Sequence, residues 1–246
     1  MTYVYDFLAG ALTYAVLKVL WVAFRPSIGT RSVLFGAHCF FLHPFFVARA
    51  WTHLYGFPWD PRLWIAFFVH DLGYLGKPNI DGPEGEEHPH LGARIIGWLF
   101  DGLREGRGYI WVGSWFARSI GYVLDKVFGV GAPGTFQTTW NDTEYRMFWS
   151  AFVAYHSRFH AKRQNVRPSR LCYADKLVTC FEPSWLYLPR VRASGELVEY
   201  MASHPGRTRS DGWIDTGYSD DPKIQKAWHR ETREFMWKWV HEQVKV

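Results

Sequence analysis

The feature that most constrains this chain is a set of histidines and aspartates carried by separate stretches of helical periodicity. When several helices of a bundle each contribute an inward imidazole or carboxylate, the side chains converge on a metal site. Adjacent residues on a helix point about 100° apart, so a His-Asp pair can direct its imidazole to one ion and its carboxylate to a second. Imidazole and carboxylate ligands without thiolate suit iron, manganese, zinc or magnesium. The set is His43, His70, Asp71, His88, His156 and Asp175.

The periodicity around these residues predicts an all-α fold. Apolar residues recur at helical spacing in six stretches, and glycine or proline marks the end of most of them. No segment has a convincing strand pattern. The predicted helices cover residues 32–55, 61–76, 88–100, 142–160, 168–181 and 222–246.

These stretches group into three regions. Residues 32–200 form the main helical domain, with an inserted segment at about 101–142. Residues 201–246 form a polar loop and a C-terminal helix that packs on the domain, and residues 1–31 form an N-terminal hydrophobic helix. Hydrophobic residues make up 48% of the chain and aromatic residues 19%, which is enough apolar surface to exclude disorder over most of its length.

The N-terminal segment from residue 7 to residue 24 is apolar around the whole helix circumference except at Lys18. It has no basic start and no small-residue cleavage site, so it does not resemble a secretory signal peptide. Three alternatives remain open: a buried core helix, a helix that contacts another copy of the chain, and a membrane anchor. If the segment spans a membrane, Arg25 and Arg31 would keep the rest of the chain in the cytoplasm.

Charge and cysteine content narrow the classes of partner and compartment. Three cysteines cannot form a disulfide framework, which favours a reducing, cytoplasmic location. Association with a membrane is the alternative. A net charge of +5 suits a phosphate-bearing substrate but does not indicate binding to duplex nucleic acid.

Four short strings carry a family resemblance: HDLGYLG at 70–76, HPHLGARII at 88–96, AYHSRF at 154–159 and LCYADKL at 171–177. Together with His43 they resemble the HD-domain superfamily of metal-dependent phosphohydrolases, over residues 32–100 and 142–200. The resemblance implies an HD-domain helical bundle. Because the chain has two histidines between the HD pair and the closing aspartate, it is similar to the dinuclear branch of that family.

The resemblance also implies a ligand set for two divalent transition metals, iron or manganese first, with zinc, nickel, cobalt or magnesium as alternatives. One ion would take His43, His70, Asp71 and Asp175, and the second would take His88, His156 and the bridging Asp71. A hydroxide held between the two cations would be the nucleophile. Two departures stand out. Tyr74 occupies a position where many members have lysine, and the GYP motif of the cyclic-di-GMP phosphodiesterases is absent after His156.

Candidate substrate-binding residues follow from the charge pattern and from histidine spacing. Between residues 158 and 192 there are eight Lys or Arg residues against two acids, which predicts an anion-binding surface beside the metals. His88 and His90 compete for one ligand position, and His156 and His160 have the i, i+4 spacing of a zinc clamp. His38 and His53 are assigned no role. The predicted substrate contacts are Arg158, Lys162, Lys176, His160, Lys77 and His90.

Three functions are therefore compared. The first is a metal-dependent phosphohydrolase that cleaves a phosphate ester or anhydride of a nucleotide or a similar small phosphorylated substrate. The second is a diiron oxygenase of the same architecture that cleaves a C–C or C–P bond with dioxygen. The third is a non-catalytic scaffold, which has no physical need for six converging ligands whose burial without metal is costly.

Overall fold

The computed structural model describes residues 27–101, 123–129, 131–133, 135–137, 144–146, 148–202 and 217–244. The apolar segment 7–24 lies outside these residues, as does most of the predicted insertion at 101–142. Within the described ranges, no helix combines the length and the apolar character that a membrane crossing requires.

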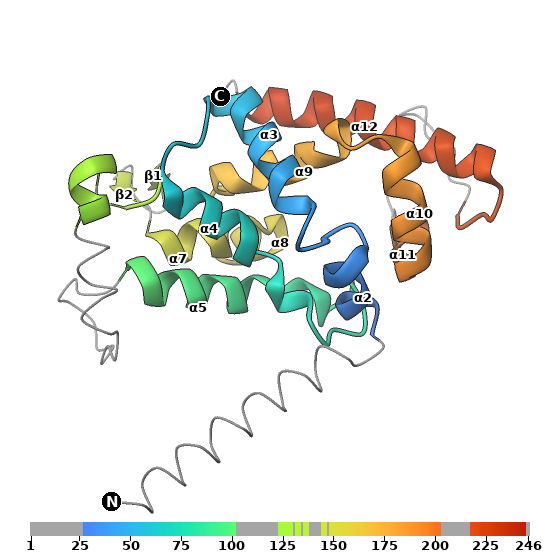
Figure 1. The fold of residues 1–246 in the computed structure, drawn as a ribbon, viewed down its shortest axis with the longest axis horizontal. Helices are drawn as coiled ribbons and strands as arrows, with labels where there is room; N and C mark the ends of the chain where they lie inside the picture. Colours follow the sequence, from blue (N-terminus) through green and yellow to red (C-terminus); the bar gives the residue numbers. More distant parts are fainter. Residues whose placement is uncertain are drawn as a thin grey trace, which may run out of the picture.

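The described chain is mainly helical, as the sequence predicts (Figure 1). A short antiparallel pair of strands, β1 (Thr135–Gln137) and β2 (Glu144–Arg146), is the exception to the all-α expectation. Two 3-10 turns, η1 (Leu72–Tyr74) and η2 (Gly85–Glu87), lie between longer helices. The helices are α2 (Ile28–Phe35), α3 (His43–Tyr55), α4 (Pro61–Val69), α5 (Pro89–Phe100), α7 (Trp149–Ala154), α8 (Arg158–Arg163), α9 (Arg170–Phe181), α10 (Ser184–Ser194), α11 (Glu196–Ala202) and α12 (Pro222–Val244).

The prediction of one helix over 142–160 is wrong. The chain there forms β2, then α7, then a turn and α8. The first helix ends at Ala154, and Ser157 starts the second, because its side-chain oxygen accepts a hydrogen bond from the backbone N–H of His160. The start of α7 is capped from a distance, since the Asp101 carboxylate accepts from the N–H groups of Trp149 and Ser150 at 2.7 Å each.

Two other stretches that were predicted to be single helices are interrupted in the structure. The stretch 32–55 divides after Phe35, where the N–H of Gly36 donates to the carbonyl groups of Arg31 and Ser32. The stretch 61–76 leaves α-helical geometry after Val69, so the His-Asp pair lies at the end of α4 rather than inside a helix. Both breaks place histidines at helix ends, where their side chains can approach those of other helices.

The main hydrophobic core forms where α3, α9 and α12 pack on one another and α5 packs on α7 (Figure 1). Val47, Trp51, Ile96, Phe152 and Leu177 are its central, fully buried members. In the ribbon, α12 lies along one edge of the molecule and α5 along the opposite edge, with α3, α4 and α9 between them. This arrangement brings the predicted ligand-bearing ends of four segments together.

A buried histidine on α12 should make the protein acid-sensitive. His229 is fully buried and shares a 2.8 Å hydrogen bond with Ser184 Oγ, and burial followed by the charge of Arg233 lowers its pKa from 6.5 to about 4. The unfolded chain therefore binds this proton at higher pH than the folded chain does. Stability should fall as pH drops from about 6.5 to 4, by up to about 3 kcal/mol from this group.

Urea unfolding at pH 7 and pH 4.5 tests this expectation. In the His229→Phe variant, which keeps the ring stacked on Tyr187, the difference in unfolding free energy between the two pH values should shrink by about that amount. An equal difference in the variant and the parent protein would contradict the assignment. Comparing the two proteins removes the contribution of the other histidines, which both share.

Candidate metal centre

The six predicted ligands come from segment ends that meet in the interior. His43 is the first residue of α3, and His70 and Asp71 directly follow α4. His88 immediately precedes α5, and His156 lies in the turn after α7. Only Asp175 is in the middle of a helix, α9. All six are buried, with exposed fractions between 1% and 7%, so their charges need compensation.

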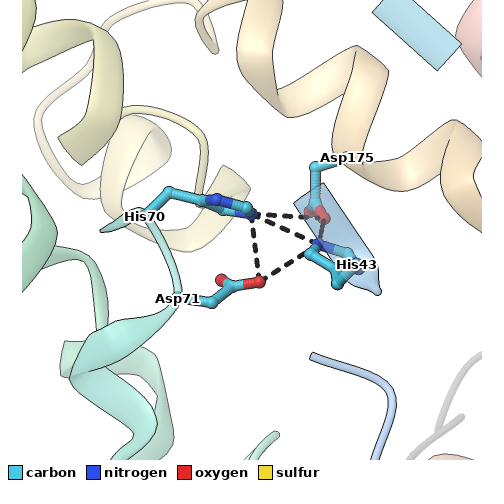
Figure 2. Close-up of side chains that lie close together, drawn as sticks. All are labelled: His43, His70, Asp71 and Asp175. Carbon is cyan, nitrogen blue, oxygen red and sulfur yellow. Dashed lines mark hydrogen bonds and ion pairs between the residues drawn. The ribbon is translucent and has the colours of Figure 1, made fainter. Parts of the chain in front are cut away.

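Four of these side chains form a first group (Figure 2). His43 Nε2 lies 3.2 Å from Asp71 Oδ2 and 3.1 Å from Asp175 Oδ1. His70 Nε2 lies 3.3 Å from His43 Nε2 and 3.0 Å from Asp71 Oδ2. Ligand atoms at about 2.0–2.2 Å from one cation are separated by roughly 3–4 Å. The four atoms thus have the spacing that a single bound ion requires.

The second group uses the other oxygen of the same aspartate. His156 Nε2 lies 3.3 Å from Asp71 Oδ1, and His88 Nε2 lies 3.7 Å from it. The two imidazole nitrogens are 2.9 Å apart. Asp71 therefore turns Oδ2 toward one group and Oδ1 toward the other, which is the arrangement of a carboxylate shared by two ions.

Backbone contacts orient three of the imidazoles. The Nδ1 atoms of His70, His88 and His156 lie 3.0, 2.7 and 2.5 Å from the carbonyl oxygens of Phe67, Gly85 and Val153. In the neutral imidazole, a proton on Nδ1 satisfies each carbonyl and leaves the Nε2 lone pair directed at the group, as in metal-ligating histidines. Asp71 Oδ2 is buried and accepts no hydrogen bond, although the Nε2 atoms of His43 and His70 lie 3.2 and 3.0 Å from it. These nitrogen donors and this carboxylate oxygen fit divalent cations.

The electrostatics differ between the two groups. Burial would raise the pKa of Asp71 and Asp175, but His70 beside Asp71, and Lys176 with His43 beside Asp175, hold both well below the usual range. Burial would lower the pKa of His70, but Asp71 and Asp175 raise it to about 10. In the second group burial dominates, and the pKa values of His88 and His156 are lowered. The site thus holds permanent carboxylates and, in the second group, neutral imidazoles, which are the ligand forms of these residues.

Of the six predicted substrate contacts, two lie beside the metal groups. Arg158 and Lys176 line a cavity of about 190 Å³ that also reaches His43 and Asp175. Lys176 Nζ is 2.9 Å from Asp175 Oδ2. The remaining four do not line this cavity: Lys77, His90, His160 and Lys162.

The structure separates the competing histidines. His90 is 48% exposed and pairs with Glu87 at 2.6 Å, whereas His88 belongs to the second group. The ring of His160 lies against those of His90 and Tyr155, while His156 faces Asp71. The turn at Ser157 breaks the single helix on which an i, i+4 clamp would depend.

Two aromatic residues beside the centre were not assigned from the sequence. His38 lines the same cavity, and its ring lies 5.5 Å from that of His43. Ser32 Oγ donates to Glu196 Oε1, so His38 Nδ1, 2.7 Å from Ser32 Oγ, acts as a donor and leaves only Nε2 for a ligand. Tyr74 stacks on His88 at 3.9 Å, which explains an aromatic residue where the family resemblance would place lysine. No local sequence signal connects His38 with Glu196.

In comparisons with known proteins, no family model, curated protein or solved structure matches the chain. The geometry therefore carries the functional argument. It establishes a buried cluster of histidines and aspartates that could hold metal ions in a mainly helical protein.

Proposed function

We propose that this protein is a dinuclear metal-dependent phosphohydrolase of the HD-domain type, acting on a nucleotide or a similar small phosphorylated compound. The observation that carries the proposal is the sharing of Asp71 between two groups of buried ligands, next to a cavity lined by Arg158 and Lys176. Two divalent ions bound there, iron or manganese by preference, would supply Lewis-acid polarisation and water activation.

The chain's own residues supply binding and orientation. Arg158 presents a planar guanidinium at the cavity, which suits bidentate contact with phosphoryl oxygens. Lys176 adds a second positive charge and also fixes the Asp175 carboxylate. His38, held by Ser32 and Glu196, presents Nε2 as a further substrate contact. Burial shields the six ligand side chains themselves from bulk water.

Assays of the metal-loaded, full-length protein with phosphate esters, in air and without oxygen, test this function. We expect equal rates of phosphate release under both conditions, and a kcat/KM about tenfold to a hundredfold lower for Arg158→Ala, because a charge-assisted contact is lost. Arg163→Ala is the matched control: it lies on the same helix, is 60% exposed and pairs with Glu87. Turnover that requires oxygen would support the oxygenase instead. No turnover with any phosphate ester would refute the proposal.

A further inference from the structure

The cavity beside the metal groups has a second part with different chemistry. Besides His43 and Asp175, its lining includes Tyr187 on α10, Tyr200 on α11 and Trp228 on α12. Tyr187 and Trp228 are buried members of one hydrophobic cluster, and Tyr200 packs against that cluster. The three rings therefore gather in one place. We call these three residues the aromatic wall.

Carboxylates surround the aromatic wall. Glu182 and Asp81 line the same cavity, and Glu196 accepts a hydrogen bond from the Tyr200 hydroxyl at 3.1 Å. Glu182 is partly compensated, because it forms an ion pair with Arg190. His38 pairs with Glu196 in the same way. Burial first, and then the charges of Glu196, Glu182 and Asp81, raise the pKa of Tyr187 well above its usual range. Three carboxylates therefore lie near the aromatic wall, and two of them have a basic partner.

The cavity is therefore lined by groups of both charges. Arg158, Lys176 and any bound cations contribute positive charge at the metal end. The aromatic wall combines three rings with carboxylates, and one face of Tyr187 is stacked on His229. A second anionic group on the substrate would be repelled there. A cation would be attracted both by the carboxylates and by the ring faces, as in the aromatic cages that bind ammonium groups.

The C-terminal helix lines the same cavity. Trp228, Thr232 and Met236 follow one another at helical spacing and place one face of α12 against the ligand space. Thr232 Oγ1 is buried without a partner and can accept a hydrogen bond from an ammonium N–H. The volume of about 190 Å³ is below the 300–1,000 Å³ typical of drug-sized ligand sites. A small substrate fits these limits best.

We propose that the substrate is a small zwitterion, with a phosphoryl group at the metal end and a primary or quaternary ammonium group at the aromatic wall. This inference rests on the proposed function for its phosphoryl half. The ammonium half rests only on the aromatic wall and its carboxylates, so the two can be tested separately.

Ligand-observed NMR on the full-length, metal-free protein tests the ammonium half. Choline is compared with 3,3-dimethylbutanol, which has the same shape without the charge, and ethanolamine is compared with propanol. For at least one pair, the dissociation constant should be about tenfold or more lower for the cation, because cation–π contacts strengthen when they are desolvated. Equal affinities within both pairs would overturn the proposal. So would tighter binding of an uncharged nucleoside, which would indicate a base-binding cavity.

Two sets of variants locate the binding. Trp228→Leu should abolish the preference for the cation, while Trp185→Leu, at a tryptophan that is 76% exposed, should leave it unchanged. Since loss of a buried tryptophan can impair folding, Met236→Lys offers a second test: its ammonium should weaken choline binding about tenfold or more relative to Met236→Leu. Binding that survives both Trp228→Leu and Met236→Lys would place the ligand elsewhere and refute the proposal.

Activity then separates this inference from the proposed function. In the metal-loaded protein, kcat/KM should be about tenfold or more higher for phosphocholine than for 3,3-dimethylbutyl phosphate, or for 2-aminoethyl phosphate than for propyl phosphate. Hydrolysis of p-nitrophenyl phosphate without either preference would support the phosphohydrolase function and refute the zwitterionic substrate. Selective binding of the cation without hydrolysis of any ester would support the ammonium site and refute the phosphohydrolase function.

Discussion

Asp71→Ala should lose both metal ions and lower phosphohydrolase activity by about 10³-fold or more. Among the six candidate ligands, Asp71 is the one whose two oxygens face different groups, 3.0 Å from His70 Nε2 on one side and 3.3 Å from His156 Nε2 on the other. Its removal takes a charged ligand from each ion. Metal catalysis contributes several kcal/mol of transition-state stabilisation, and each 1.36 kcal/mol is a factor of ten in rate.

Elemental analysis of protein purified without added metal measures this loss. The parent protein should carry about two equivalents, and Asp71→Ala close to none. Asp220→Ala, at an exposed aspartate just before α12, is the control and should keep the parent's metal content. Full activity in the Asp71→Ala protein would show that the chemistry occurs elsewhere.

His156→Ala should divide the site, leaving about one equivalent of metal and lowering activity by about 10²-fold. The first group, with His43, His70, Asp71 and Asp175, does not depend on His156 for any ligand. The second group would retain only His88 and one oxygen of Asp71, which is too few ligands to hold an ion firmly. Metal content and kcat, measured on the same preparation, test this expectation.

The matched control is His160→Ala, four residues further along the chain. His160 lies on α8 beside His90 and contributes to neither ligand group, so its loss should leave the metal content unchanged. Equal metal loss in His156→Ala and His160→Ala would instead support a two-histidine clamp. Loss of both equivalents in His156→Ala would show that the two groups bind metal only together.

The sequence contained enough information to select the residues of the candidate metal centre. Six residues chosen by type, order and apolar flanks lie together in two overlapping groups, although His43 and Asp175 are far apart in the chain. These six residues could be chosen from the sequence because each histidine or aspartate ends or interrupts an apolar helical stretch, and that pattern is local. The mainly helical fold follows from the same periodicity.

The helix boundaries were harder to predict from the sequence, because long-range contacts determine them. The predicted helix 142–160 fails where Ser157 begins a new helix and where Asp101, from the end of α5, caps α7. Nothing within residues 142–160 indicates that Asp101 lies nearby. The apolar pattern continues across the break, so periodicity alone joins the two helices.

By itself, the sequence determined the residue types of the centre, their order and their placement on helical segments. The tertiary structure decided which oxygen of Asp71 faces which group. It also brought His38, which pairs with Glu196, and one face of α12 to the same cavity. The physical reason is the distance along the chain over which each kind of interaction acts. Helical periodicity depends on neighbours three and four residues apart, whereas the cavity is formed by side chains that meet only after the helices pack.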